Sequence, residues 1–282
     1  MNLPFEIDLK DKVAVVTGAG GVLCSLFAKA IARCGAKVAL LDLNLEAAAK
    51  FAADIAAEGG TAKAYAANVL KKETLLEARE QIRRDFGTCD ILVNGAGGNN
   101  PRATTTNEYY LDGDMEKDIT TFFNLEPAGV EFVFNLNFLG TLIPTQVFAE
   151  DMLGKEDASI LNVSSMNAFT PLTKIPAYSG AKAAVSNFTE WLAVHFSKAN
   201  IRVNAIAPGF FVTAQNQALL FDEAGNPTAR TAKILNSTPM GRFGEAEELI
   251  GSLLFLLSKP AAGFITGVVI PVDGGFSAYS GV

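Results

Sequence analysis

Short apolar runs rich in β-branched residues alternate along the chain with longer stretches in which apolar residues recur every three or four positions. The short runs predict buried strands and the longer stretches predict amphipathic helices. Strands are predicted over residues 12–17, 37–41, 62–67, 91–94, 159–163, 202–207 and 268–272. Helices are predicted over residues 23–34, 44–58, 73–86, 132–152, 177–197 and 246–257. This alternation predicts one doubly wound α/β domain over residues 1–282, with a parallel seven-stranded sheet flanked by helices.

Two long polar segments, residues 97–129 and 210–244, interrupt the alternation. Each follows the carboxyl end of a predicted strand, which is where open α/β sheets bind their ligands. Long segments in compact domains often have a function. We therefore expect both segments to cover the substrate.

The run Tyr178-Ser179-Gly180-Ala181-Lys182 opens a predicted helix and carries the first candidate chemistry. Tyr178 and Lys182 are four residues apart, so they share a helix face. A nearby cation favours the phenolate, which would let Tyr178 carry a proton near neutral pH. Ser165 follows the strand 159–163 and would present its hydroxyl at the same edge of the sheet. The alternative is an ordinary helix with a surface tyrosine and lysine.

A glycine-rich turn containing Gly18, Gly20 and Gly21 lies between the first strand and the first helix. Backbone N–H groups at such a helix N-terminus bind a pyrophosphate. Asp42 ends the second strand, where a carboxylate accepts hydrogen bonds from the adenosine ribose. That carboxylate would repel a 2′-phosphate and Leu43 adds no cation, so NAD is favoured over NADP. A helix-capping or turn aspartate is the alternative for Asp42.

Composition narrows the class of protein. Hydrophobic residues make up 49% and charged residues 19% of the chain, which is typical of a globular protein. A net charge of −7 disfavours nucleic acid as a partner. Cys24, Cys34 and Cys89 lack metal-ligand spacing, so we expect reduced thiols and no metal site. The start of the chain lacks a signal pattern and residues 249–257 are too short to span a bilayer. We expect a cytoplasmic protein that does not bind membranes.

Several short motifs occur in a fixed order: Thr17-Gly18, Asn94-Gly95-Ala96-Gly97, Asn137-x-x-Gly140, Ser165, Tyr178-x-x-x-Lys182, and Pro208-Gly209 with Thr213. With these motifs the chain resembles the short-chain dehydrogenase/reductase family over nearly its whole length. The resemblance implies a Rossmann-type domain in which Tyr178 is the general acid/base. It also implies that Lys182 lowers the pKa of the tyrosine and binds the nicotinamide ribose, that Ser165 polarises the substrate carbonyl, and that Asn137 holds a water in a proton relay.

The same resemblance implies an NAD site. Its residues would be Gly18, Gly20, Gly21, Val22, Leu23, Asp42, Leu43, Asn68, Val69, Asn94, Ala96, Gly97, Tyr178, Lys182, Pro208, Gly209, Phe211 and Thr213. The family usually has glycine where this chain has Val22 and Cys24, so we expect a shifted turn with the site retained. Asn68 replaces an aspartate that commonly meets the adenine amine, and Gly95 replaces a second asparagine.

Four further runs, residues 97–101, 137–141, 164–169 and 273–281, resemble the D-mannonate oxidoreductase (fructuronate reductase) branch of the family. This implies a sugar-acid substrate, with D-fructuronate reduced to D-mannonate or the reverse. The substrate would meet Asn99, Arg102, Ser165, Asn167, Lys174 and Tyr178, with Asn100, Gln215 and Asn216 nearby. Because guanidinium groups bind carboxylates bidentately, Arg102 is the first candidate for the carboxylate and Lys174 the second.

Other functions stay open. A different sugar or polyol dehydrogenase, such as a gluconate dehydrogenase, shares parts of the same runs. A 3-oxoacyl thioester reductase would need a wider apolar groove and a basic docking patch. A non-catalytic NAD-binding regulator would not need the complete set of Asn137, Ser165, Tyr178 and Lys182.

Family resemblance also implies a homotetramer, or a homodimer, in which the helices 132–152 and 177–197 pack across a twofold axis. Trp191 and Phe196 would then belong to the core or to the subunit contact. The lone histidine, His195, lies in the second of these helices and is expected at the surface or the interface, without a catalytic role.

Overall fold

A parallel sheet of seven strands runs through the chain, and a computed structural model describes residues 6–212, 220–222 and 226–281. The order of the strands is β3-β2-β1-β4-β5-β6-β7. Their bounds are β1 (Val13–Thr17), β2 (Lys37–Asp42), β3 (Thr61–Ala66), β4 (Ile91–Asn94), β5 (Ala158–Val163), β6 (Ile201–Pro208) and β7 (Val269–Val272). Every neighbouring pair is parallel, so the predicted doubly wound α/β fold is confirmed.

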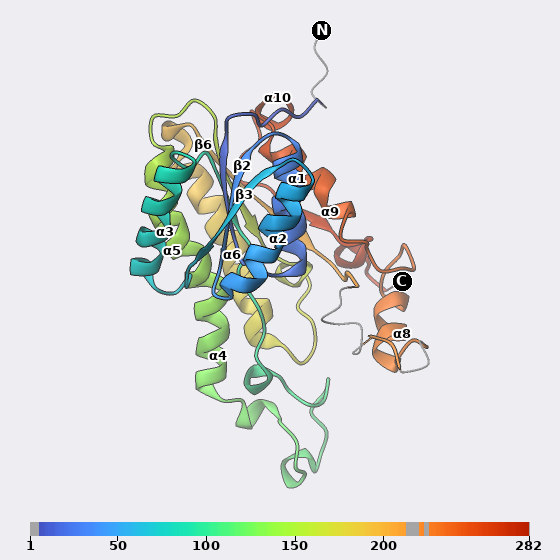
Figure 1. The fold of residues 1–282 in the computed structure, drawn as a ribbon. Helices are drawn as coiled ribbons and strands as arrows, with labels where there is room; N and C mark the ends of the chain where they lie inside the picture. The colour runs from blue at the N-terminus through green and yellow to red at the C-terminus, as the bar shows by residue number, and fades with distance from the viewer. Residues whose placement is uncertain (1–5, 213–219, 223–225, 282) are drawn as a thin grey trace.

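Helices cover both faces of the sheet (Figure 1). The helices are α1 (Val22–Arg33), α2 (Leu45–Ala57), α3 (Lys72–Asp85), α4 (Pro127–Phe134), α5 (Gly140–Phe148), α6 (Pro176–His195), α8 (Ala229–Asn236), α9 (Glu248–Leu257) and α10 (Lys259–Ala262). One core cluster joins the sheet to α1, α2 and α9, and a second joins it to α3, α5 and α6. The chain therefore forms three layers.

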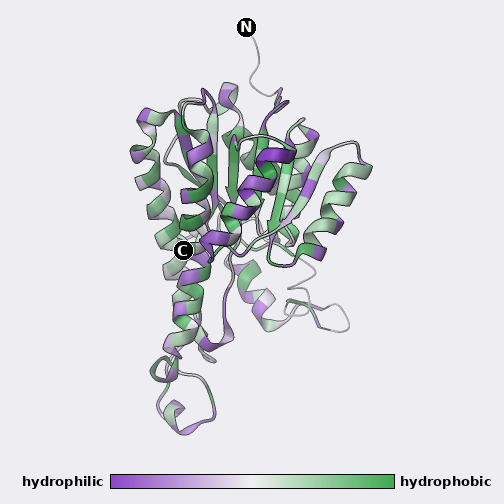
Figure 2. Cartoon of the chain, turned by 60° about the vertical axis from the view of Figure 1, so that its left-hand side comes forward, coloured by the Kyte–Doolittle hydropathy of each residue, from purple (hydrophilic) through white to green (hydrophobic). Residues whose placement is uncertain are grey.

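The central strands are buried along their whole length because both of their faces meet helices. All residues of β1 and β4 are buried, which matches their continuous apolar sequence. Figure 2 shows the hydrophobic colour concentrated on the strands and on the inward sides of the helices. Phe27 and Ile31 of α1 pack on one face of the sheet, and Leu75 and Ile82 of α3 pack on the other.

The predicted helix 132–152 begins five residues earlier and is not uniform. It begins at Pro127, passes through a π-helical turn, η4 (Asn135–Leu139), and ends in a 3₁₀ turn, η5 (Ala149–Met152). Among the described residues, the stretch Pro127–Met152 is the one helix long and apolar enough by composition to cross a membrane, and half of its most apolar part is buried within the domain. Core helices of globular proteins have the same property.

The segment 210–244 was expected to be a covering loop, but it contains the helix α8. Thr228 caps this helix, since its side chain accepts a hydrogen bond from the backbone N–H of Thr231. The segment 97–129 holds three short 3₁₀ turns, η1 (Pro101–Ala103), η2 (Asp114–Glu116) and η3 (Phe122–Asn124), before α4 starts.

Three neighbouring strands place their following segments together. β4, β5 and β6 are adjacent and parallel, so the chain leaving each of them emerges at the same edge of the sheet. Figure 1 shows the segment between β4 and α4, together with α8, extending beyond this edge. The carboxyl edge therefore carries most of the irregular structure.

Candidate active site

Ser165 and Tyr178 meet just beyond the carboxyl end of β5. Ser165 is buried at the start of a 3₁₀ turn, η6 (Met166–Ala168), where its hydroxyl accepts the N–H of Asn167. Tyr178 lies in the first turn of α6, which Pro176 starts with its fixed backbone angle. Desolvation by the surrounding protein raises the pKa of Tyr178, and a hydrogen bond with Ser165 offsets part of the rise. The tyrosine is therefore protonated and bonded to the serine.

Lys182 lies one helical turn after Tyr178 and is buried. Its ammonium donates to the carbonyl oxygen of Val163 over 2.8 Å and lies 5.7 Å from the centroid of the Tyr178 ring. Burial lowers the pKa of Lys182 to about 8. The sequence predicted that this cation would lower the pKa of Tyr178. In the structure the net shift of Tyr178 is upward, because desolvation outweighs the favourable contacts.

Asn137 occupies the π-helical turn η4 and is fully buried. Its side-chain N–H₂ donates to the carbonyl oxygens of Gly98 (2.7 Å) and Val133 (2.8 Å), and its Oδ1 accepts the N–H of Gly98. A Cβ on Gly97 would lie 2.7 Å from this Oδ1 and 3.1 Å from the Lys182 nitrogen. The side chain of Asn137 therefore fixes the backbone at Gly97 and Gly98, beside Lys182. π-Helical turns often occur at functional sites.

A cleft of about 400 Å³ lies between the carboxyl ends of β1, β2 and β4. Its lining brings together most of the predicted cofactor residues: Gly18, Gly21, Val22, Leu23, Asp42, Leu43, Asn68, Val69, Ala96 and Gly97. Five further lining residues were not in the predicted set, namely Cys24, Leu41, Ala67, Gly95 and Leu136. Leu41, Ala67 and Gly95 are each next to a predicted cofactor residue in the sequence, so the sequence could have indicated them. Leu136 is brought to the cleft only by folding.

The residues of this cleft fit a dinucleotide. Gly18 has a positive φ of 69° and a Cβ there would lie 2.9 Å from the backbone of Ala96, so only glycine fits. Gly21 precedes α1 without any side-chain cap, which leaves the N–H groups of the first turn for an anionic ligand. The Asp42 carboxylate accepts the N–H of Gly20 over 2.9 Å, so it also holds the glycine-rich turn against β2.

Cys24 and Gly95 form a complementary pair at the floor of the cleft. A Cβ built on Gly95 would lie 2.1 Å from the Cys24 sulfur. The thiol therefore fills the space that a side chain at position 95 would need. This explains both departures from the family pattern together, since a cysteine in the helix requires the glycine that replaces asparagine. Burial raises the pKa of the Cys24 thiol to about 12, so it stays protonated.

Other predicted cofactor residues have a structural role or lie elsewhere. The side chain of Asn94 is buried and donates to Thr145 and Asn162, which ties β4 to β5 and α5. The Asn68 side-chain oxygen accepts the N–H of Leu70. Pro208, Gly209 and Phe211 lie at the end of β6, where Phe211 lines a separate hollow beside Asp273. Thr213 lies outside the described residues.

The other predicted substrate residues that the structure describes lie in two segments, one after β4 and one between β5 and α6. Asn167 is buried in η6, and its Oδ1 has no hydrogen-bond partner among the described residues. Asn99 donates to Thr104, and Arg102 pairs with Glu126 across 3.4 Å. Lys174 adopts a positive φ of 72° shortly before α6. Asn100 accepts the N–H of Arg102, while Gln215 and Asn216 lie outside the described residues.

Comparisons with known proteins identify the class. The family model described as enoyl-(acyl carrier protein) reductase matches residues 23–277. An uncharacterized oxidoreductase of Haemophilus influenzae is 64% identical over 282 residues, covering 100% of this chain and 99% of its own. The chain therefore belongs to the short-chain dehydrogenase/reductase family of NAD(P)-dependent oxidoreductases, as the sequence predicted.

Two solved structures are similar over their whole length. A Haemophilus protein provisionally named a D-mannonate oxidoreductase, with bound NAD, is 64% identical, with a TM-score of 0.95 and full coverage of both chains. A gluconate 5-dehydrogenase from Burkholderia cenocepacia, in complex with NADP and tartrate, is 27% identical. Its TM-score is 0.83, with 98% of this chain and 99% of that chain covered. Both relatives therefore share the nucleotide-binding fold described above.

Proposed function

We propose that the protein is an NAD-dependent oxidoreductase that interconverts a sugar-acid ketone and its alcohol, with D-fructuronate and D-mannonate as the pair. The observation that carries the proposal is the hydrogen-bonded pair of Ser165 and Tyr178 beside buried Lys182, at the edge that also holds the dinucleotide cleft. The provisional name and the bound NAD of the relative with 64% identity support it.

Ser165 and Tyr178 would act on the same oxygen of the substrate. When bound, the nicotinamide cofactor supplies a hydride to the carbonyl carbon, or accepts one from the alcohol carbon. The Tyr178 hydroxyl donates its proton to the carbonyl oxygen during reduction and takes the proton back during oxidation. Ser165 lies beside Tyr178, and in the complex it would turn its single hydroxyl proton from Tyr178 to the same oxygen and stabilise the charge that develops there.

Lys182 and Asn137 would hold these groups in place. The Lys182 ammonium, fixed by the Val163 carbonyl, lies 5.7 Å from the centroid of the Tyr178 ring, and in the complex it would donate to the nicotinamide ribose. The Asn137 side chain holds Gly98 through two hydrogen bonds and is itself anchored by a third to the Val133 carbonyl oxygen, so it shapes the wall next to Lys182. We assign the water of the proton relay to the region between Asn137 and Lys182.

Recognition of the sugar acid would use neutral polar groups and one or more cations. The unpartnered, buried Oδ1 of Asn167 favours a hydroxyl-bearing ligand, because a buried acceptor without a donor is unfavourable. Arg102 pairs with Glu126, and its backbone carbonyl accepts the N–H of the same residue. These contacts favour a role for Arg102 in ordering its own segment, which moves Lys174 ahead of it as the partner of the substrate carboxylate.

Asp42 supports the preference for NAD. Its carboxylate lines the cleft beside exposed Leu43, and a 2′-phosphate there would face a negative charge without a cation. We expect NADH to be preferred over NADPH, and Asp42→Ala to narrow the difference in kcat/KM. A wild-type protein that prefers NADPH would overturn this part of the proposal.

The direct test is to follow NADH oxidation on addition of D-fructuronate, with 5-keto-D-gluconate as the competing substrate. We expect the higher kcat/KM with D-fructuronate. Higher efficiency with 5-keto-D-gluconate would favour a gluconate 5-dehydrogenase, the function named for the Burkholderia relative. Binding of NADH without turnover of any sugar acid would favour the non-catalytic regulator.

We also propose that the protein assembles as a homotetramer, or at least a homodimer, through α5 and α6. A groove of about 520 Å³ runs between these helices, and Trp191 (57% exposed) and His195 stack within it, 4.7 Å apart. Val194 is 77% exposed on the same helix. Exposed apolar groups of this extent mark contact surfaces. A monodisperse monomer in light scattering at micromolar concentration would rule the assembly out.

A further inference from the structure

Three charged side chains from three separate segments gather above the catalytic edge. Glu108 lies in the segment after β4, Lys174 in the segment between β5 and α6, and Lys233 in α8, which follows β6. These strands are neighbours, so the segments leave the sheet side by side. Ser165 and Tyr178 flank the middle segment. All three charged residues therefore belong to segments that leave the sheet at the edge that carries Ser165 and Tyr178.

Lys233 and Glu108 make a direct ion pair between two of these segments. The Lys233 nitrogen lies 2.9 Å from both carboxylate oxygens of Glu108. The third segment is tied to the first by a backbone hydrogen bond of 2.9 Å, from the N–H of Thr105 to the carbonyl oxygen of Lys174. Lys233 chiefly, and Lys174 in addition, hold the pKa of Glu108 below its ordinary value. Both cations therefore act on one carboxylate.

This arrangement differs from the other ion pairs near the same edge. Arg102 pairs with Glu126, Lys117 with Asp114, and Arg242 with Glu248. Each of those pairs joins residues of one segment and stabilises its local shape. The Glu108–Lys233 pair instead joins residues 125 positions apart. A carboxylate that is paired with a lysine of another segment, with Lys174 adding a further favourable charge, has a contact that a bound sugar acid would make.

We propose that Lys174 and Lys233 form the binding site for the substrate carboxylate, and that Glu108 occupies this site until the substrate displaces it. This inference rests on the proposed sugar-acid substrate and adds Lys233 and Glu108 to its site. Glu108 thereby acts as an internal competitor, since it keeps Lys233 paired when no substrate is bound. Uncharged sugars do not displace it, so the same three residues select for acids.

Displacement is energetically feasible because the pair is exposed to water. The side chain of Lys233 is 67% exposed and that of Glu108 is 27% exposed. Exposed ion pairs are weak, which means that a second carboxylate can compete for the cations. A substrate also held by Ser165, Tyr178 and Asn167 brings its carboxylate at high effective concentration.

The test is a measurement of ligand binding to the complex of the enzyme with NADH, which cannot oxidise an alcohol, by isothermal titration calorimetry. The probes are D-gluconate and D-sorbitol, which differ by a carboxylate in place of a hydroxymethyl group. The variants are Glu108→Gln, Lys233→Met and Lys174→Met. Glu131→Gln and Lys50→Met serve as matched controls, because they remove the same charges from exposed helix positions on α4 and α2.

We expect Glu108→Gln to bind D-gluconate about two- to fivefold more tightly, since a competing exposed ion pair is lost. Lys233→Met and Lys174→Met are each expected to weaken D-gluconate binding about tenfold, as for a lost charge-assisted hydrogen bond at a partly exposed site. Binding of D-sorbitol is expected to stay within about twofold in all variants, and the two controls are expected to match the wild type.

Whether Glu108→Gln strengthens or weakens the binding of D-gluconate decides whether Glu108 competes with the substrate carboxylate. Weaker binding of both probes would mean that the ion pair only holds α8 in place, and would overturn the inference. Unchanged D-gluconate binding in Glu108→Gln or Lys233→Met, or no D-gluconate binding by any of these proteins, would overturn it as well. The assay is independent of turnover. Inactivity on D-fructuronate with the expected D-gluconate pattern would therefore refute the proposed substrate while supporting the carboxylate site.

Discussion

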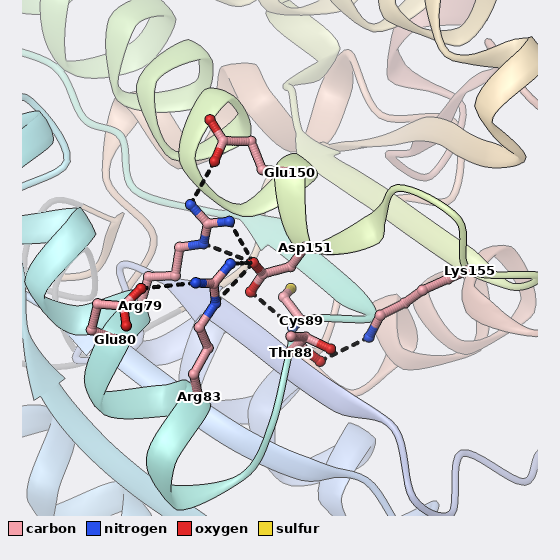
Figure 3. Close-up of polar contacts among 8 residues, drawn as sticks. All are labelled: Arg79, Glu80, Arg83, Thr88, Cys89, Glu150, Asp151 and Lys155. Atoms are coloured by element: carbon pink, nitrogen blue, oxygen red, sulfur yellow. Dashed lines mark hydrogen bonds and ion pairs between the residues drawn. The ribbon is translucent and has the colours of Figure 1, made fainter.

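Two charged clusters lie at opposite edges of the sheet, and they differ in burial. Asp151 of η5 accepts hydrogen bonds from Arg79 and Arg83 of α3 and from the backbone N–H of Cys89, just before β4 (Figure 3). The Asp151 side chain is 2% exposed. At the carboxyl edge, Glu108 and Lys233 form one pair that water reaches from outside.

The contrast lies in how completely each charge is satisfied within the protein. Arg79 also donates to Glu150 over 2.7 Å, and Lys155 nearby donates to the carbonyl oxygen of Thr88 (Figure 3). Lys155 also pairs with Asp90, so the charged groups at the amino ends of the strands have partners within the protein. Such a buried network fixes the packing of α3 against η5. The carboxyl edge keeps charges and buried polar atoms with few partners, and those are the groups that a ligand can use.

Tyr178→Phe gives the largest effect and acts on the carboxyl edge alone. We expect kcat to fall about 10²–10⁴-fold, because the proton donor is removed, while NADH affinity and melting temperature stay close to those of the wild type. Steady-state kinetics, fluorescence titration of NADH and thermal unfolding test the three parts. Near-normal turnover would refute the role of Tyr178.

Asp151→Asn is the corresponding substitution in the buried cluster at the amino ends of the strands. We expect a loss of about 3–5 kcal/mol in the free energy of unfolding, because Arg79 and Arg83 would lose a buried partner. KM of the remaining folded enzyme is expected to be unchanged. The control is Glu80→Gln, which removes an exposed partner of Arg83 and should cost about 1 kcal/mol or less. Equal losses in urea denaturation of the two variants would contradict the distinction between buried and exposed pairs.

Gly95→Ala is expected to destabilise the protein by about 1–3 kcal/mol and to weaken NADH binding, because the new methyl group meets the Cys24 sulfur. Cys24→Ala removes that sulfur and leaves the Cβ of residue 24 at 3.6 Å from the new methyl position, an ordinary contact, while the Thr17 carbonyl oxygen stays close at 3.1 Å. The double variant should recover most of the loss in a double-mutant cycle. Additive losses would show that the two positions are independent.

The pH dependence of stability gives the smallest effect. Burial raises the pKa of Asp151, but hydrogen bonds from Arg83 and Arg79 lower it by more, so the net shift is downward. A carboxyl group with a lowered pKa in the folded state stabilises the protein above its ordinary pKa of about 3.9, and this contribution is lost as the pH falls below it. The stability of Asp151→Asn should therefore fall less steeply than that of the wild type between about pH 5 and 3. Parallel curves would exclude this contribution.

The sequence by itself predicted the elements with strong periodicity. All seven strands were predicted within about two residues of their ends, and the buried central strands were the clearest because they require continuous apolar runs. Tyr178, Lys182 and Ser165 were predicted as neighbours because helical spacing and the carboxyl end of β5 constrain their positions. The family assignment followed from motif order, which the comparisons confirmed.

Tertiary structure decided what depends on contacts between distant segments. Residues 229–236 form a helix that the sequence reading treated as part of a loop, although the cap at Thr228 was a usable signal. The direction of the Tyr178 pKa shift depends on desolvation, which adjacency to Lys182 does not reveal. The complementarity of Cys24 and Gly95 and the pairing of Glu108 with Lys233 each join positions more than 70 residues apart. The spacing of apolar residues predicts local geometry and burial. Which side chains contact each other across distant segments is determined only when the sheet brings those segments together.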